Sequence, residues 1–364
     1  MGFKCGIVGL PNVGKSTLFN ALTKASVSAE NYPFCTVEPN LGVVPVPDNR
    51  IWRLTEIAQP KKTIPSTMSF VDIAGLVEGA SQGEGLGNRF LSHIREADAI
   101  AHVVRCFEDP NVGHVTGSVS PLTDIETINT ELVLADLETA SRAETRVRKI
   151  ARAGSKEDKE LHAVLEVILS TLDQNRPLRS IELSDRELEL IRDYRFLTAK
   201  PVMYVANVDE VSLEGGELAD QVRNYSEQDG AEFVIVCSKL EAEIAQLETD
   251  HERDEYLAMV GLEEPGLARV IRTGYRLLGL HHFFTVGPEE VRAWTIPIGA
   301  MAHAAASKIH TDFERGFIRA EVVGYDEFIE HRGETASRSA GALRSEGKEY
   351  QIADGDIVHF LFNV

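Results

Sequence analysis

Short apolar runs, separated by polar or glycine-rich segments, recur along the chain up to about residue 240. Runs of this length, bounded by turn residues, are typical of strands buried in the sheet of an α/β protein. The runs that we interpret as strands are Phe3–Val8, Leu41–Val46, Thr67–Asp72, Ala99–Val104, Pro201–Ala206 and Phe233–Cys237. They predict an α/β fold with a doubly wound, mostly parallel sheet.

The interval between the runs Thr67–Asp72 and Pro201–Ala206 is longer than the two βα units of about 30 residues each that a minimal fold needs. It contains two series with helical spacing, Ile125, Ile128, Leu132 and Ala135, then Leu161, Leu165, Ile168 and Leu172. Gly154-Ser155 separates the two series, and Ser184–Glu187 fits the capping box of a third helix. These narrow apolar seams predict a projecting helical hairpin, inserted over residues 124–196.

Alternating apolar and polar positions begin at His282 and predict a second, smaller domain at residues 279–364. The expected strands are His282–Val286, Val291–Ile296, Ile318–Val323 and Asp354–Phe362, with helices at Ala302–Ile309 and near Ala340–Glu346. A hairpin, a helix and returning strands in a segment of this size fit a β-grasp domain.

Composition and charge narrow the range of functions. The 364 residues are enough for two or three domains, and the formal net charge of −20 argues against wholesale binding of nucleic acid. No apolar stretch is long enough to span a membrane, and the N-terminus leads directly into the first strand, so we expect no signal peptide and no membrane partner. The four cysteines form no C-x-x-C pair, which favours free thiols in a reducing cytoplasm.

The turn after the first strand carries the most specific motif. Gly9-Leu-Pro-Asn-Val-Gly14-Lys15-Ser16 fits G-x-x-x-x-G-K-[ST], with a strand before it and a helix after it. Backbone N–H groups and the helix N-terminus would surround phosphate oxygens, Lys15 would reach the β- and γ-phosphates, and Ser16 would bind Mg²⁺. The alternative is a glycine-rich turn with a chance lysine. The nucleotide-binding residues expected here are Asn12, Val13, Gly14, Lys15, Ser16 and Thr17.

Two later segments match the switch regions of a nucleotide-dependent protein. Thr36 lies in a polar, proline-containing loop before the second strand, where a threonine closes over Mg²⁺ and the γ-phosphate. Asp72-Ile-Ala-Gly75 fits D-x-x-G, so Asp72 would reach the metal through water and the Gly75 N–H would face the γ-phosphate. The glycine-rich stretch at residues 79–87 is consistent with a segment that γ-phosphate orders, although a flexible surface loop is the alternative.

These motifs together resemble a known family. The P-loop, Asn31-Tyr-Pro-Phe-Cys-Thr36, Asp72-Ile-Ala-Gly-Leu76 and Gly83-Glu-Gly-Leu-Gly-Asn-Arg-Phe-Leu-Ser-His-Ile-Arg95 are similar to the Obg-like branch of the translation-factor-related GTPases. The resemblance covers nearly the whole chain and is closest to the YchF subfamily of Obg-like ATPases. It implies a P-loop G domain at residues 1–123 and 197–278, an inserted helical hairpin, and a C-terminal β-grasp domain of the TGS type.

Leu76 occupies the position at which many GTPases carry the glutamine that orients the attacking water. Leucine cannot hydrogen-bond to water, so another residue would position the nucleophile, or hydrolysis would be slow. His102 lies inside an apolar strand, which favours a core role, and His93 lies on a helix. His114, in a loop after a strand end, is our candidate, supported by the matching histidine of YchF-like proteins; a solvated loop histidine is the alternative.

Asn207-Val208-Asp209-Glu210 stands where a GTPase would carry Asn-Lys-x-Asp. The missing aspartate matters because its carboxylate accepts hydrogen bonds from guanine N1–H and the 2-amino group. Glu210 is one methylene longer and Val208 lacks the lysine stem, whereas Asn207 can still pair with an adenine N6/N7 edge. Ser238 begins the short loop whose backbone would approach the purine. These changes weaken a preference for guanine, and the resemblance to YchF proteins implies ATP.

The resemblance also carries expectations about cofactors and partners. Related GTPases that potassium stimulates have an asparagine at the place of Asn12, so K⁺ is expected as a possible second ion beside Mg²⁺. A cluster near the hairpin tip and scattered basic residues in the C-terminal domain are candidate contacts for the ribosome or its large subunit, rRNA phosphate included, although solvated faces would also carry such residues. The cluster comprises Arg142, Arg146, Arg148, Lys149 and Arg152. No DNA partner is expected.

The sequence therefore predicts a cytoplasmic, Mg²⁺-dependent P-loop ATPase that acts as a nucleotide-gated switch on the ribosome, in translation or stress response. Lys15 and His114 are the expected catalytic residues, and Ser16, Thr36 and Asp72 the expected metal-site residues. Two alternatives stay open. One is a GTPase of the same architecture, and the other is a ribosome- or RNA-binding module in which hydrolysis is incidental.

Overall fold

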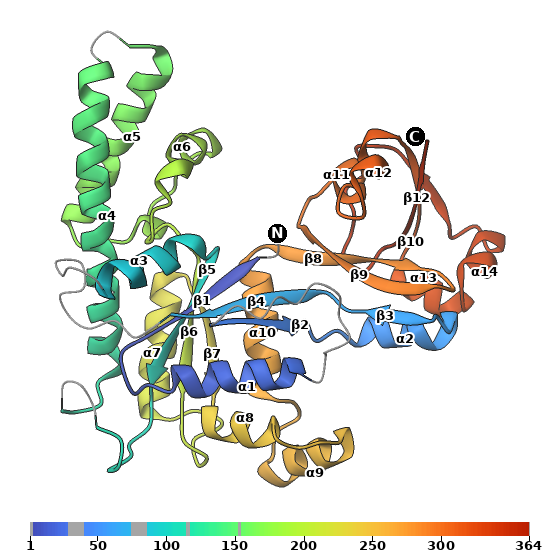
Figure 1. Cartoon of the computed structure of the whole chain (residues 1–364), viewed down its shortest axis with the longest axis horizontal. Helices are drawn as coiled ribbons and strands as arrows, with labels where there is room; N and C mark the ends of the chain where they lie inside the picture. Colours follow the sequence, from blue (N-terminus) through green and yellow to red (C-terminus); the bar gives the residue numbers. More distant parts are fainter. Residues whose placement is uncertain (1–2, 28–39, 74–85, 114–116, 152–153, 364) are drawn as a thin grey trace.

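The structure is a computed structural model of the chain, and it describes residues 3–27, 40–73, 86–113, 117–151 and 154–363 (Figure 1). Three predicted site residues, Thr36, Gly75 and His114, lie outside these ranges, and so do Leu76 and Arg152. Their roles stay predictions. Within the described ranges, no helix combines the length and the apolar character needed to cross a bilayer.

Six of the described strands form the main sheet, in the order β2-β4-β1-β5-β6-β7. They are β1 (Lys4–Val8), β2 (Leu41–Pro45), β4 (Thr67–Asp72), β5 (Ala99–Arg105), β6 (Val202–Asn207) and β7 (Glu232–Val236). The edge strand β2 is antiparallel to β4, and the other neighbours are parallel. The predicted α/β fold with a mostly parallel sheet is confirmed.

Helices pack against this sheet around one apolar core. Leu18, Ile94, Val222 and Val270 belong to the same buried cluster as the strands, and they come from four different helices. The helices of this part are α1 (Lys15–Val27), α3 (Leu86–Glu96), α7 (Glu217–Asp229), α8 (Ser238–Ile244), α9 (Asp250–Val260) and α10 (Gly266–Leu277). Because parallel strands end at the same edge of a sheet, the loops after β1, β5, β6 and β7 meet there.

Helix α4 (Pro121–Ala151) and helix α5 (Lys156–Asp173) form the predicted hairpin, which projects from the main sheet at the end away from the second sheet (Figure 1). Its apolar seam includes Ala140 and Val147 of α4 and the predicted series of α5. The predicted series of α4 lies elsewhere, because Ile125, Ile128, Leu132 and Ala135 pack into the core of the main sheet. A capping box at Ser155 starts α5. The predicted capping box at Ser184 starts α6 (Asp185–Ile191), and the short helices η1 (Leu178–Ser180) and η2 (Arg192–Tyr194) flank α6.

A buried carboxylate joins the base of the hairpin to the sheet. Asp136 of α4 accepts hydrogen bonds from the Leu197 N–H at 2.9 Å, the Thr198 N–H at 2.7 Å and the Thr198 hydroxyl at 2.7 Å. Burial raises the pKa of Asp136, and these donors oppose that rise. The three donors sit just before β6, so Asp136 fixes the point at which the chain returns from the hairpin to the sheet.

Replacing Asp136 with alanine is expected to lower the free energy of unfolding by about 3 kcal/mol, because it leaves buried donors without an acceptor. Urea denaturation followed by circular dichroism measures this loss. The control is Glu138→Ala on the same helix, where an exposed side chain should change stability by less than about 0.5 kcal/mol. Equal effects of the two variants would contradict the role assigned to Asp136.

The second sheet has the order β11-β10-β12-β8-β9-β3 among the described strands. Its members are β3 (Lys62–Ile64), β8 (Leu280–Val286), β9 (Glu290–Pro297), β10 (Phe317–Val323), β11 (Arg344–Glu346) and β12 (Ile357–Phe362). Short helices accompany it: α11 (Ala302–Ala306), α12 (Thr311–Arg315), α13 (Tyr325–His331) and α14 (Glu334–Ser339). The predicted helix near Ala340–Glu346 is wrong. Gly341, at φ +78°, follows the end of α14, and residues 344–346 pair with β10.

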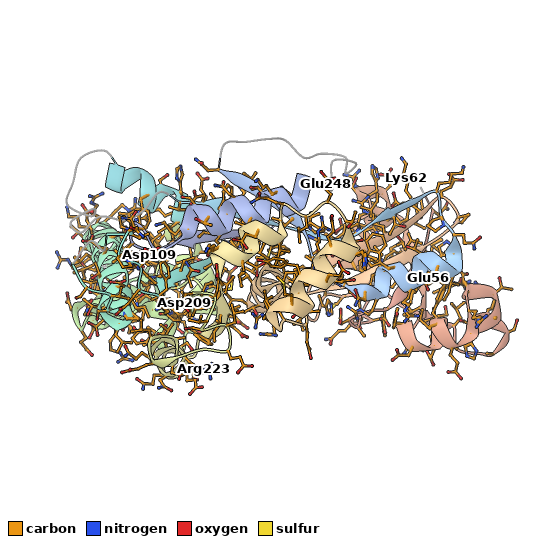
Figure 2. All side chains as sticks on the ribbon, turned by 90° about the horizontal axis from the view of Figure 1, so that it is seen from below. Glu56, Lys62, Asp109, Asp209, Arg223 and Glu248 are labelled. Atoms are coloured by element: carbon orange, nitrogen blue, oxygen red, sulfur yellow. The ribbon has the colours of Figure 1, made fainter. Side chains whose placement is uncertain are left out.

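One part of the second sheet comes from the N-terminal half of the chain. Strand β3 pairs in parallel with β9, and helix α2 (Asn49–Ala58) inserts Ile51 and Leu54 into an apolar cluster with Phe284. Figure 2 shows Glu56 and Lys62 at the end of the molecule that the second sheet forms. The predicted domain boundaries did not include this connection. Residues 49–64, which lie between β2 and β4 in the chain, therefore belong to the second sheet and its core.

A polar network reinforces this connection. Asp48 caps α2, and its carboxylate is hydrogen-bonded to the buried imidazole of His282 in β8. Although burial opposes it, the hydrogen bonds from His282 and Arg50 hold the pKa of Asp48 well below its usual range. The Arg50 guanidinium also donates two hydrogen bonds to Asp354, at 2.9 and 3.1 Å. The two parts of the chain are thus joined by the Arg50–Asp354 ion pair and the Asp48–His282 hydrogen bond as well as by apolar packing.

Candidate functional site

The P-loop connects β1 to α1, and its glycines lie where a side chain would not fit. A Cβ at Gly9 would lie 2.4 Å from the Val103 carbonyl oxygen, and one at Gly14 would lie 2.2 Å from the Asn207 amide nitrogen. Gly14 also has φ +98°, and Asn12 has φ +63°. The loop therefore approaches β5 and β6 through its backbone, with its N–H groups beside the N-terminus of α1, as an anion-binding turn requires.

Lys15, the first residue of α1, is almost fully buried, with 6% of its surface exposed. Its Nζ donates a hydrogen bond to the Leu10 carbonyl at 2.6 Å, within the P-loop itself. Burial lowers the pKa of Lys15 to about 8, although the nearby carboxylate of Asp72 acts in the opposite direction. A desolvated ammonium ion held by one carbonyl can exchange that partner for a phosphate oxygen at little cost.

The structure brings two of the three predicted metal-site residues together. Asp72 ends β4, the strand next to β1, and its carboxylate is hydrogen-bonded to the Ser16 hydroxyl. Burial raises the pKa of Asp72, whereas Lys15 and Ser16 act to lower it. The Asp72 Oδ1 atom is buried and has no hydrogen-bond partner among the described residues. A hydroxyl and a carboxylate with a free oxygen fit the oxygen ligands that Mg²⁺ prefers.

A cavity of about 440 Å³ opens beside the P-loop, at the edge where the loops after β5, β6 and β7 meet. Asp109 and Asp209, labelled in Figure 2, come from the first two of these loops. The size and position suit the base and ribose of a nucleotide whose phosphates lie in the P-loop. Its lining includes Gly14, Thr17, Phe107, Glu108, Asp109, Val112, Asn207, Val208, Asp209, Glu210, Cys237, Ser238 and Lys239.

Asn207 connects two walls of this cavity. Its amide nitrogen donates to the Val13 carbonyl at 2.8 Å, and its amide oxygen accepts from the Ser238 N–H at 2.9 Å. The side chain thereby fixes the P-loop against the turn that starts α8. These two contacts leave one N–H of the Asn207 amide available. Pairing of that N–H with the base stays a prediction. The Ser238 hydroxyl is buried in the same wall without a hydrogen-bond partner among the described residues.

Glu210 lies at the mouth of the cavity, and Lys239 binds its carboxylate. The Lys239 Nζ lies 2.6 Å from Glu210 Oε1. Val208, two residues earlier, is buried and leaves no cationic stem over the cavity. Glu210 therefore stands in place of the aspartate that reads guanine in a GTPase, and its longer side chain is paired with Lys239.

The histidines fall into different environments. His102 is buried inside β5 beside the ring of Tyr204, with the ring centroids 5.5 Å apart, and its pKa is lowered to about 3, mainly by burial. Its predicted core role is confirmed. His93 is exposed on α3 and lines a small cavity that also contains Asp72. Gly113, which precedes His114, accepts a hydrogen bond from the Asn12 amide at 3.2 Å, so that end of the loop is attached to the P-loop.

Several residues of the site were not predicted. Phe107 and Asp109 reach the cavity from the loop after β5, and Lys239 reaches it from the first turn of α8; their positions depend on the order of strands in the sheet. The signal that could have found them is their place directly after a buried strand, the rule by which Asn207 and Ser238 were found. Arg105, the last residue of β5, could also have been found from the sequence, because it is the single charged side chain at the end of a largely apolar run.

Comparisons with known proteins agree with this geometry. A family model described as "50S ribosome-binding GTPase" matches residues 4–135, and the model YchF-GTPase_C, described as "Protein of unknown function (DUF933)", matches residues 280–363. The Ribosome-binding ATPase YchF of Haemophilus ducreyi is 59% identical over 364 residues, which are 100% of each chain. The chain belongs to the YchF family.

Other YchF proteins extend the comparison. The Ribosome-binding ATPase YchF of Bacillus subtilis is 50% identical over 367 residues, covering 100% of both chains. The solved structure of the Schizosaccharomyces pombe YchF GTPase is 38% identical, with a TM-score of 0.90 over 99% of this chain and 98% of that one. The YchF fold therefore extends over the hairpin and the second sheet as well as the nucleotide-binding part.

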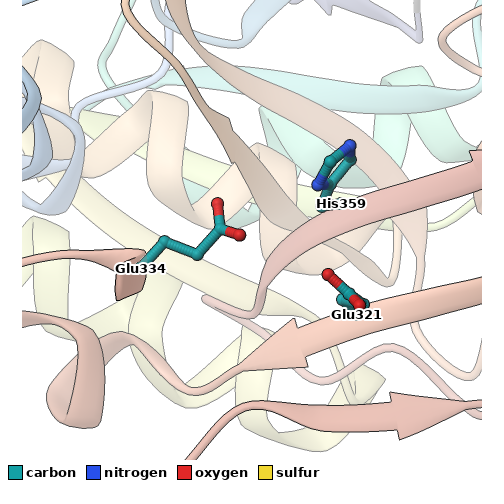
Figure 3. Close-up of side chains that lie close together, drawn as sticks. All are labelled: Glu321, Glu334 and His359. Carbon is teal, nitrogen blue, oxygen red and sulfur yellow. The ribbon is translucent and has the colours of Figure 1, made fainter. Parts of the chain in front are cut away.

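Among the described residues of this YchF-family chain, Glu321, Glu334 and His359 in the C-terminal part form a further group with the side-chain types that bind metals (Figure 3). Arg338 of α14 already pairs with both carboxylates, at 2.7 Å from Glu321 and 3.0 Å from Glu334. Its guanidinium supplies the positive charge that a metal ion would otherwise supply. We interpret this group as an ion-pair cluster that fastens α14 to β10.

Proposed function

We propose that the chain is a P-loop ATPase that hydrolyses ATP to ADP and phosphate and associates with the ribosome according to its nucleotide state. The observation that carries the proposal is the base side of the cavity, where Val208 and the Glu210–Lys239 ion pair replace the groups that read guanine. Relatives covering the whole chain have the name Ribosome-binding ATPase YchF, which favours the same activity and partner.

The proposed reaction is an in-line attack of water on the γ-phosphorus, with cleavage of the bond to the β–γ bridging oxygen. P-loop N–H groups and Lys15 bind the phosphate oxygens and neutralise the charge that develops on them. Ser16, Thr36 and Asp72 would hold Mg²⁺, which supplies further charge neutralisation when bound. Since Leu76 cannot orient water, we assign that role to His114.

Adenine selectivity follows from the hydrogen-bonding groups of the two bases. Guanine presents N1–H and a 2-amino group that need a common carboxylate, and Glu210 is engaged with Lys239 at the cavity mouth. Adenine needs no such carboxylate, because its N1 is an acceptor and it has no 2-amino group. We assign to its N6/N7 edge two polar groups of the cavity lining, the remaining N–H of Asn207 and the buried hydroxyl of Ser238.

Calorimetric titration with ATP and with GTP, at equal Mg²⁺, tests this proposal. We expect ATP to bind at least about tenfold more tightly, a difference of about 1.4 kcal/mol. The double variant Val208→Lys, Glu210→Asp should raise GTP affinity, since it restores the base-reading groups of a GTPase. Equal or tighter GTP binding by the unaltered protein would instead support the GTPase alternative. Repeating the ATP titration in potassium and then in sodium tests the K⁺ site proposed at Asn12.

The ribosome is proposed to contact the helical hairpin at residues 124–196 and the C-terminal domain at residues 279–364, beside the G domain at residues 1–123 and 197–278. A cytoplasmic location is part of this proposal. Co-sedimentation with ribosomes, measured without nucleotide, with ADP and with a non-hydrolysable ATP analogue, tests the gating. Equal association in all three states would favour the binding-module alternative, and no association in any state would exclude the ribosomal role.

A further inference from the structure

Arg105 is a buried arginine without a carboxylate partner among the described residues. It ends β5, and only 2% of its surface is exposed. Arginine is almost never buried to this degree unless its charge is compensated. The compensation must therefore come from neutral groups, and the neighbouring loop provides them.

The guanidinium of Arg105 donates hydrogen bonds to three carbonyls of the loop that follows β5. Its Nε donates to Phe107 at 3.1 Å, its Nη1 to Val112 at 3.0 Å and its Nη2 to Asp109 at 3.5 Å. It also lies over the Phe107 ring, 4.6 Å from the centroid. These contacts are spread over residues 107–112, so one side chain holds this part of the loop at three points.

This loop forms one wall of the nucleotide cavity. Phe107, Glu108, Asp109 and Val112 all line the cavity. Within the same loop, the Gly113 carbonyl accepts a hydrogen bond from the Asn12 amide and is thereby attached to the P-loop. On the other side, Arg105 pairs in register with Asn207 of β6, and the Cys106 N–H donates to the Asn207 carbonyl at 2.8 Å. Arg105 thus lies between the wall of the cavity and the residue that braces its other walls.

We propose that Arg105 is a positioning residue for nucleotide binding, which holds residues 107–113 as a finished wall of the cavity before the nucleotide arrives. A wall that is formed only part of the time would weaken binding in proportion to the fraction of molecules that have it. The proposal rests on the nucleotide site proposed above but not on the choice of base, because the wall serves ATP, ADP and GTP alike.

Arg105→Lys tests the proposal. Lysine keeps the positive charge, but its compact ammonium cannot reach three carbonyls as the planar guanidinium does. We expect the dissociation constants for ATP and ADP, measured by calorimetry with the full-length protein, to rise at least about tenfold. The matched control is Arg179→Lys. Arg179 is also largely buried, but it pairs with Asp229 away from the cavity. The Arg179→Lys variant should change nucleotide affinity less than about twofold while lowering the free energy of unfolding.

Two results would overturn the proposal: nucleotide binding by folded Arg105→Lys within about twofold of the unaltered protein, or an equal loss in Arg179→Lys. Should Arg105→Lys fail to fold, hydrogen exchange of the unaltered protein decides. The amides to follow are those of Asn111 and Val112, which both donate hydrogen bonds to Asp109 within the wall. Protection of these two amides before ATP is added supports a preformed wall, and protection that arises only with ATP contradicts it. Failure of the proposed ATPase function can be distinguished from failure of the role proposed for Arg105. It would appear as tighter binding of GTP than of ATP by the unaltered protein. The affinities of the same variants would then be compared with GTP as the ligand.

Discussion

Replacing Lys15 with alanine is expected to lower kcat/KM for ATP hydrolysis by about 10²–10³-fold or more. Lys15 is the buried cation of the P-loop, and its Nζ bonds to a carbonyl of the loop that is to hold the phosphates. A preorganised donor in a site shielded from water contributes this much to the stabilisation of a transition state. Steady-state release of phosphate, with Mg²⁺ and potassium present, measures the loss.

The control is Lys24→Ala, which removes an exposed lysine from the last turn of the same helix and should leave kcat/KM unchanged. The Lys15 variant should not be less stable, because it removes a charge whose burial is unfavourable. If Lys15→Ala keeps more than about a tenth of the activity, the assigned catalytic role is wrong.

The pKa of Lys15 adds a pH dependence to the same prediction. Burial lowers this pKa from 10.5 to about 8 in the protein without nucleotide. Only the protonated ammonium attracts phosphate, so kcat/KM should fall as the pH rises through about 8, by up to about tenfold per pH unit. The profile of Lys15→Ala should lack this decline. A flat profile of the unaltered protein between pH 7 and 9.5 would contradict it.

The elements that the sequence predicted are those whose pattern is local. The apolar runs of β1, β5 and β6 are buried along almost their whole length, and the seams of α4 and α5 follow a helical period. Strand β3 could not be predicted in this way. It is a half-exposed three-residue segment, and its partner β9 lies in the C-terminal part of the chain. Nothing within its own sequence indicates which sheet it joins.

The same distinction, between local patterns and contacts of distant segments, applies to the residues of the site. The P-loop could be predicted because one short segment contains all its phosphate-binding groups. The brace at Asn207 and the wall held by Arg105 depend on β5 and β6 being neighbours, which is a property of the folded sheet. The Glu210–Lys239 pair joins the loop after β6 to the first turn of α8, so the sequence indicated the change of residue type but not the direction of the side chain.

Replacing Asp72 with asparagine is expected to separate catalysis from binding. The variant keeps the size of the side chain but loses the negative charge beside Ser16 and Lys15. We expect hydrolysis at saturating ATP to fall by about 10²–10³-fold, because the Mg²⁺ site loses its carboxylate. ATP binding in EDTA should be unchanged or tighter, since a negative charge facing the phosphates is gone. Titration of activity with Mg²⁺ and calorimetry in EDTA measure the two effects.

The charge of Asp72 also acts on Lys15, which provides an internal check. Asp72 raises the pKa of Lys15 against the effect of burial, so its removal should lower that pKa below about 8. ATP affinity of Asp72→Asn in EDTA should therefore begin to fall at a lower pH than that of the unaltered protein. Asp220→Asn, at an exposed position on α7, is the control and should move neither the activity nor the pH profile. An unshifted profile in Asp72→Asn would mean that the two side chains are not electrostatically coupled, and the metal and phosphate subsites would then be independent.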